Sequence, residues 1–296
     1  MLILSVACGI AAAIVYGSAS AVQHQAVNTG TEVADPRGLW ELLRNPRWLL
    51  SIGGDAVGVV FQVIALATGP VVLIQPLLVL TLPVSLVVGY LLGGPSPRRG
   101  DYLACLSIIG GLGVFFVLLG TPGAGHPPHS RAILATVLIA VLGGGALCAL
   151  VHRHGPTLRA GVYGGVAGAW FGTVGVLLNA AATEFTDHGL RGLLLHARGL
   201  VPLLGILVLG VLGMTLTQVS FQVGALAASF PANKSADQVA AVVLGAVLLH
   251  ERVPAGAAHV VGYLLCLGAI VAGAVRLAEP APATSEHTAV AEPEAH

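Results

Sequence analysis

Three ionisable side chains lie within long apolar stretches of the sequence, where a charge is costly. They are Asp55, Lys234 and Asp237. Charged groups inside a membrane-spanning helix usually mark a path for ions, protons or substrate. Lys234 and Asp237 are three residues apart, so on a helix they share a face and can pair. The spacing predicts a functional site. The alternatives are a purely structural ion pair for Lys234 and Asp237, and a position near the membrane surface beside Arg47 for Asp55.

Amide side chains accompany these charges in other apolar stretches. An amide offers donors and an acceptor, so it can bind a polar solute or join two helices by a hydrogen bond. Both roles stay open for each amide. Together, the charges and amides predict a polar substrate-binding cavity formed by Asp55, Gln62, Gln75, Asn179, Gln218, Gln222, Lys234 and Asp237.

The charges favour one class of cargo over another. The Lys234 ammonium suits an anionic or zwitterionic metabolite, with Asp237 or Asp55 as the proton-coupling group. Magnesium would instead need several hard oxygen ligands, of which Asp55 and Asp237 could supply two as metal ligands. The sequence contains no P-loop for ATP, so an ion gradient or the membrane potential must drive transport. We therefore expect a gradient-coupled metabolite carrier, with a magnesium or other divalent-cation transporter as the alternative.

Other functions fit less well. The sequence has no HExxH or GxSxG motif, so we expect no enzyme, and we expect no cofactor. A non-transporting membrane scaffold is a further alternative, although a scaffold would not need intramembrane charges. Zero formal net charge argues against a nucleic-acid partner. The loop pairs His126 with His129 and His152 with His154 have no cysteine or carboxylate cluster around them, so no zinc site is predicted there.

The composition places these residues in a membrane. The chain has 296 residues, of which 56% are hydrophobic and only 9% are charged, whereas soluble domains carry about 25% charged residues. Basic residues are almost all arginine, as is typical of a GC-rich bacterial genome. The sequence predicts an all-α, multi-pass protein of the bacterial cytoplasmic membrane. Its oligomeric state is left open, with a homodimer as one option.

Nine segments are long and apolar enough to be membrane-spanning helices, at about 20 residues each. They cover residues 2–25, 47–68, 70–93, 100–120, 131–151, 159–182, 200–227, 229–250 and 256–276. Pro76 and Pro83 are expected to bend the third helix. Residues 183–198 alternate charge with leucine, which predicts a short interfacial helix or a loop. The Pro- and Ala-rich tail, 279–296, is expected to be disordered.

The sequence repeats itself at a distance of about half its length. Residues 61–67 recur at 221–227 with six of seven positions identical, an offset of 160. Tyr16-Gly17-Ser18 is matched by Phe171-Gly172-Thr173 at an offset of 155. Because five helices separate corresponding elements, the copies would cross the membrane in opposite directions. The sequence therefore predicts two inverted repeats, a feature of secondary transporters.

The repeat divides the chain into parts. We expect a first repeat at 1–130 (helices one to four), a fifth helix with its connecting loop at 131–158, and a second repeat at 159–278 (helices six to nine), followed by the tail. The first helix has a counterpart in the second repeat, so we expect it to be retained rather than cleaved. Eight arginines fall on the side of the first loop and four on the other, which predicts an external N-terminus and a cytoplasmic tail.

Several segments resemble the NIPA-like magnesium transporter family, which lies within the drug/metabolite transporter superfamily of EamA-like fold. The resemblance rests on residues 48–92 with the run 70–77, on His154-Gly155-Pro156-Thr157, and on Gln218 ahead of Ala225-Leu226. It covers about residues 5–276 and implies a nine-helix transporter of inverted repeats, with magnesium as the cargo.

The sequence departs from that family at three places. Many members have an acidic residue at the position aligned with Val59, whereas this chain has Asp55 one helical turn earlier. It has Gln62 where the family often has asparagine, and it adds Lys234 inside the eighth helix. A metabolite carrier therefore stays the first interpretation.

Overall fold

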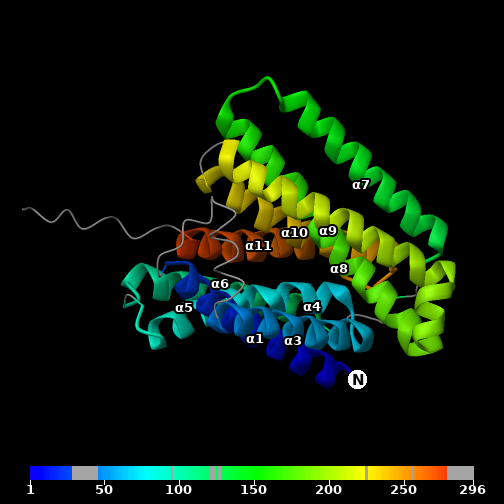
Figure 1. Ribbon diagram of the computed structural model, residues 1–296, viewed down its shortest axis with the longest axis horizontal. Coiled ribbons are helices and arrows are strands. Elements are labelled where there is room, and N and C mark those ends of the chain that lie inside the picture. Colours follow the sequence, from blue (N-terminus) through cyan, green and yellow to red (C-terminus); the bar gives the residue numbers. More distant parts are fainter. Residues whose placement is uncertain are drawn as a thin grey trace, which may run out of the picture.

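The computed structural model describes residues 1–28, 46–94, 96–120, 125, 128–223, 226–254 and 256–278. The described chain consists of helices joined by short connections, without a β-strand in those ranges. The helices are α1 Leu2–Asn28, α3 Pro46–Thr68, α4 Val71–Leu77, the 3-10 helix η1 Leu78–Leu80, α5 Thr81–Leu91, α6 Arg99–Leu119, α7 Ser130–Val151, α8 Pro156–Leu195, α9 Ala197–Val223, α10 Leu226–Leu248 and α11 Ala257–Ala278 (Figure 1). The predicted tail, 279–296, lies outside the described residues.

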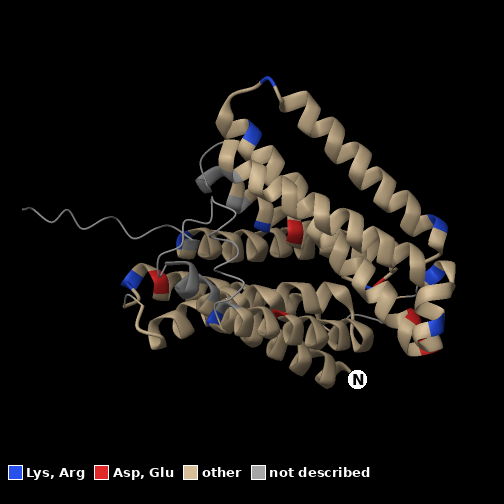
Figure 2. Cartoon of the chain, viewed as in Figure 1, with Lys and Arg blue, Asp and Glu red and all other residues tan. Residues whose placement is uncertain are grey.

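Eight segments within the described ranges are long and apolar enough to cross a membrane, with α4, η1 and α5 counted as one. They correspond to eight of the nine predicted spans. The remaining one, predicted at 229–250, is helical as α10 but carries Asn233, Lys234, Asp237 and Gln238. Large apolar side chains point outward from the bundle, such as Val117 at 81% and Ile139 at 72% exposure. Lys, Arg, Asp and Glu gather mainly toward the helix ends (Figure 2). The chain is therefore an all-α, multi-pass membrane protein.

The third span is broken at one proline rather than two. Pro76 lies inside α4, which ends at Leu77, and the 3-10 helix η1 follows from Leu78. Proline has no backbone N–H, so the hydrogen bond from residue 76 to the Val72 carbonyl is missing. Pro83, by contrast, occupies the first turn of α5. Backbone N–H groups in a first turn have no partner within their own α-helix, so a proline there costs little. The α-helix thus gives way to a 3-10 helix shortly after Pro76, while Pro83 sits where the new helix starts.

Residues 183–198 are mostly helical rather than a loop, and the kink at Gly189 makes residues 190–195 a short helix at the end of α8. Helix α8 runs on to Leu195, with a break at Gly189 (φ 64°, ψ −163°). His196 is extended, and α9 starts at the next residue, Ala197. A positive φ suits glycine because it has no Cβ. The glycine break turns the last part of α8 back on itself, so α8 and α9 meet without a loop.

The helices pack in two groups that meet in the centre of the bundle. In the first part of the chain α1 packs on α3 and α5, and in the second part α8 packs on α9 and α10. Helix α4 contacts α8 and α10, and α6 packs on α11, which joins the two groups. Helix α7 packs on α8 and α9 at the periphery (Figure 1). The largest core cluster includes Ile74, Phe115 and Ile270, and it lies where the two groups meet.

Glycines allow the closest helix pairs to form. A Cβ on Gly17 of α1 would lie 2.7 Å from the Thr81 carbonyl oxygen and 2.7 Å from Val84 Cβ, both of α5. A Cβ on Gly172 of α8 would overlap the carbonyl oxygen of Asp237 in α10. Small residues let membrane helices approach to backbone contact. Gly17 and Gly172 therefore set how near α5 and α10 come to the helices they pack on.

Candidate functional site

Two adjoining cavities lie between the two groups of helices. The first, of about 330 Å³, is lined by residues of α1, α4, η1, α5, α10 and α11. The second, of about 440 Å³, is lined by residues of α3, α4, η1, α8, α9 and α10. Four residues line both: Gln75, Leu78, Lys234 and Asp237. The cavities therefore share a wall that carries an amide, an ammonium and a carboxylate.

Helix α10 supplies most of the polar groups. Asn233, Lys234, Asp237 and Gln238 are spaced so that they share one face of the helix. The Lys234 ammonium is near enough to act electrostatically on the Asp237 carboxylate. Asn233 donates from Nδ2 to Thr217 Oγ1 of α9 at 3.4 Å. Gln238 is buried, and its Oε1 has no hydrogen-bond partner within the described ranges.

A buried hydrogen-bond acceptor without a partner in an apolar environment costs free energy. Gln238 lines the first cavity, although its Oε1 atom itself is shielded from solvent. The predicted pair Lys234 and Asp237 therefore lies in a wider polar surface. Asn233 and Gln238, two further amides of the same apolar stretch, belong to that surface.

A hydrogen bond between α1 and α3 supports the cavity wall opposite α10. Tyr16 donates its hydroxyl to Gln62 Oε1 at 2.8 Å. Gly58, one turn before Gln62, makes room for the ring, because a Cβ there would lie 2.7 Å from Tyr16 Cε1. Asp55 is close enough to act electrostatically on Tyr16. Tyr16 lines the first cavity and Gln62 the second, so this bond joins the walls of the two.

Gln75 is held where the two groups of helices meet. Its side chain is buried, with 6% exposure, on the helix broken at Pro76. It fills the space that a side chain on Gly175 of α8 would need. The amide thus reaches from α4 to the surface of α8 and borders both cavities.

Four of the eight predicted binding residues lie elsewhere. Asp55 lines neither cavity, although it faces Tyr16 as described above. Asn179 donates to the Leu66 carbonyl of α3, the helix-joining role that was left open for the amides. Gln218 and Gln222 are exposed on α9 and line neither cavity. The structure brings together Gln62, Gln75, Lys234 and Asp237.

Sequence reasoning missed Tyr16 and Thr217 as cavity residues. Tyr16 had a usable signal, because it heads the triplet Tyr16-Gly17-Ser18 that recurs at 171–173. Phe171, its counterpart in that match, lines the second cavity while Tyr16 lines the first. Thr217 had no such signal, since a hydroxyl in a membrane helix commonly bonds its own backbone, as Thr217 also does to Gly213.

The connection between α10 and α11 contacts the hinge between α3 and α4. The Glu251 carboxylate accepts the backbone N–H of Val71 at 2.7 Å and of Val72 at 2.9 Å, which caps the first turn of α4. Burial raises the pKa of Glu251, although the two amide bonds oppose that shift. The structure thus makes Glu251 a buried helix cap.

These features define a class: a helical membrane protein with a polar, charged cavity between two groups of helices. Among known proteins, an uncharacterised protein of Corynebacterium glutamicum is 31% identical over 257 residues, covering 84% of this chain and 86% of the relative. The chain belongs to the family of that protein. No family model matches the chain, and no solved structure matches it. The resemblance to NIPA-like and other drug/metabolite transporters therefore stays a hypothesis.

Proposed function

We propose that the protein is a secondary transporter that carries a small polar solute across the cytoplasmic membrane of a bacterium. The observation that carries this proposal is the shared wall of the two cavities, where Lys234 and Asp237 lie inside an otherwise apolar bundle. Ionisable groups at such depth are costly and usually serve transport. The cavity volumes, about 330 and 440 Å³, fall within the roughly 300–1,000 Å³ of small-molecule sites.

The arrangement suggests how substrate and driving ion could share one site. Lys234 would bind an anionic group of the solute, and Gln75 and Gln62 would donate or accept hydrogen bonds to its polar edges. Asp237 would carry the coupling proton, because its carboxylate faces the same space as the ammonium. Protonation of Asp237 would remove the negative charge that competes with the solute for Lys234. This links proton movement to substrate affinity without ATP.

Packing supports an inverted repeat. Helix α1 packs on α3 and α5 as α8 packs on α9 and α10, while α6 packs on α11, its expected counterpart. The paired glycines Gly17 and Gly172 occupy corresponding close contacts in the two groups. In transporters built this way, the two repeats rock against each other around a site at their interface. The shared cavity wall lies at such an interface.

A magnesium transporter is the second candidate. The Asp237 carboxylate and the amide oxygens of Gln75 and Gln62 border one cavity, and hard oxygen atoms are the ligands that magnesium prefers. Two features count against it. The Lys234 ammonium borders the same space, and Asp55, the second predicted carboxylate ligand, lines neither cavity.

The test is transport by purified protein in proteoliposomes, with a panel of anionic and zwitterionic metabolites compared with magnesium under an imposed proton gradient. Gln75→Ala should raise KM for the transported solute, because it removes a cavity amide. Gln218→Ala is the matched control, since that amide is exposed on α9, and it should leave transport unchanged. Absence of flux for every solute, with the protein folded, would contradict the proposal; magnesium flux alone would favour the second candidate.

A further inference from the structure

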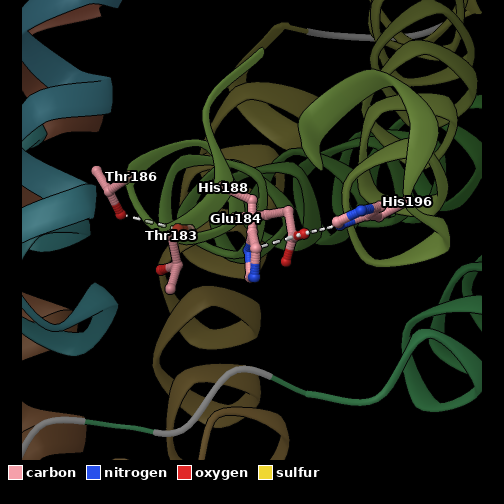
Figure 3. A network of polar contacts seen from close by, with 5 residues as sticks. All are labelled: Thr183, Glu184, Thr186, His188 and His196. Carbon is pink, nitrogen blue, oxygen red and sulfur yellow. Dashed lines mark hydrogen bonds and ion pairs between the residues drawn. The ribbon is translucent and has the colours of Figure 1, made fainter. Parts of the chain in front are cut away.

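A second polar cluster lies beyond the cavities along α8, near the break at Gly189. Glu184 and His188 are four residues apart and share a face of α8. His196 follows the break and returns to the same carboxylate (Figure 3). His188 Nδ1 lies 3.2 Å and His196 Nδ1 2.9 Å from Glu184 Oε1. Two imidazoles from either side of a helix break thus meet one carboxylate oxygen.

The burial of the three side chains differs in a way that suits a binding site. The Glu184 side chain is 8% exposed, whereas those of His188 and His196 are 48% and 53% exposed. The carboxylate is therefore held at the base of the cluster, and the imidazoles border the surface. The two rings stand at 70° to each other with centroids 5.3 Å apart. They are not stacked face to face, so both can direct a ring nitrogen at a shared point.

Glycines make this geometry possible. Gly189 has φ 64°, which lets the chain turn where a side chain would be strained. A Cβ on Gly192 would overlap His188 and lie 3.2 Å from Glu184 Oε1, so glycine leaves the space beside the carboxylate open. A Cβ on Gly199 would overlap the backbone of Leu193. Each of these glycines is needed for His196 to reach Glu184.

The spacing of the three donor atoms matches that of a zinc site. One donor atom from each residue can be chosen so that all lie within 4.8 Å of one another. Around a tetrahedral zinc with bonds of about 2.0–2.2 Å, neighbouring ligand atoms are roughly 3.3–3.5 Å apart. The observed 2.9 and 3.2 Å would need to open by only a few tenths of an ångström. Two histidines with one glutamate are a known zinc-binding set that leaves a fourth position for water.

We propose that Glu184, His188 and His196 bind a zinc ion, and that the ion fastens the break in α8 to the start of α9. Imidazole nitrogen favours zinc and similar transition metals over magnesium, which prefers oxygen. The site is separate from the cavities, because none of its three residues lines either one. It therefore does not depend on the transport proposal. Sequence reasoning looked for zinc only at the loop histidines and missed this set, since the break at Gly189 brings its third member back.

The test uses the purified full chain in lipid nanodiscs, without an affinity tag, titrated with zinc alone. Wild type should bind one zinc per chain, and zinc should raise its Tm. Loss of a residue that only hydrogen-bonds a metal ligand lowers metal affinity by roughly 10–100-fold. His188→Ala and His196→Ala each remove a ligand itself, so each should weaken zinc binding by more than that. Both side chains are about half exposed, so these variants should fold. The double variant His152→Ala with His154→Ala is the matched control, because it removes two exposed imidazoles from the α7–α8 connection.

The control variant should keep wild-type zinc affinity, and millimolar magnesium should not displace zinc from the wild type. The assignment fails if wild type binds no zinc at micromolar concentration, or if His188→Ala and His196→Ala bind zinc as tightly as wild type. It also fails if the His152 and His154 variant loses the zinc, or if magnesium displaces it. Any of these results would mean that Glu184, His188 and His196 contact one another by hydrogen bonds and do not form a zinc site.

Discussion

Replacing Gly17 with alanine should separate α1 from α5. A Cβ there would lie 2.7 Å from the Thr81 carbonyl oxygen and 2.7 Å from both Cβ and Cγ1 of Val84. Ordinary contact begins near 3.4 Å, so the helices must move apart by about 0.7 Å. Neither neighbour yields easily, because one is backbone and the other a β-branched side chain with a stiff χ1.

The size of the effect follows from two opposing terms. Overpacking of this kind costs about 1–3 kcal/mol, whereas glycine to alanine in a helix gains about 0.5–1 kcal/mol. The Gly17→Ala protein should therefore be destabilised, by up to about 2.5 kcal/mol. Gly172→Ala should behave in the same way, because it forces α8 away from the Asp237 backbone. Both changes should also slow transport, since Tyr16 and Asp237 border the cavity.

The assay is thermal unfolding of the purified protein, followed alongside transport in proteoliposomes. Gly113→Ala on α6 is the matched control, because its Cβ would meet no atom within 4 Å. That control should keep its Tm or gain slightly. If Gly17→Ala is as stable as Gly113→Ala, close contact between α1 and α5 does not organise this part of the bundle, and the reasoning fails.

Three further changes test other parts of the account. Glu251→Gln should lower stability by about 1–2 kcal/mol, because the amide keeps only one acceptor for the Val71 and Val72 N–H groups; an unchanged Tm would contradict the capping role. Tyr16→Phe should lower stability by about 1 kcal/mol, since it removes one hydrogen bond between α1 and α3, and it should raise KM because that bond joins the walls of the two cavities. Thermal unfolding and flux measurements check this, and an unchanged KM would separate that bond from substrate binding. A reporter fused after Arg276 should be active in the cytoplasm, as the arginine distribution predicts; periplasmic activity would reverse the orientation.

The sequence predicted the helices well because their main signal is local. A run of about 20 apolar residues can only be a helix in lipid, whatever its neighbours are. Two segments differ from the predicted helices, and in each the cause is the local backbone conformation. Pro83 falls in the first turn of α5, where a proline costs little, and residues 183–195 are helical on both sides of the single break at Gly189.

The site was harder to predict because it depends on which face of each helix meets another. Gln218 and Gln222 lie on α9 as Gln62 lies on α3, yet only Gln62 borders a cavity. The three glutamines do not differ in residue type or depth. They differ because the rotation of α9 against α8 leaves Gln218 and Gln222 outside the cavities. Lys234 and Asp237 border the same two cavities because residues three positions apart on one helix share a face wherever that helix packs.

The measurement that bears most directly on the central claim is substrate flux through Lys234→Ala, Asp237→Ala and the double variant in proteoliposomes. If Lys234 binds an anionic solute, Lys234→Ala should abolish transport in a folded protein, and the double variant should stay inactive. If Lys234 only neutralises Asp237, the double variant should recover, because a single unpaired buried charge is the costly state. Magnesium flux that survives Lys234→Ala but is lost with Asp55→Asn would contradict the metabolite carrier and establish the cation transporter in its place.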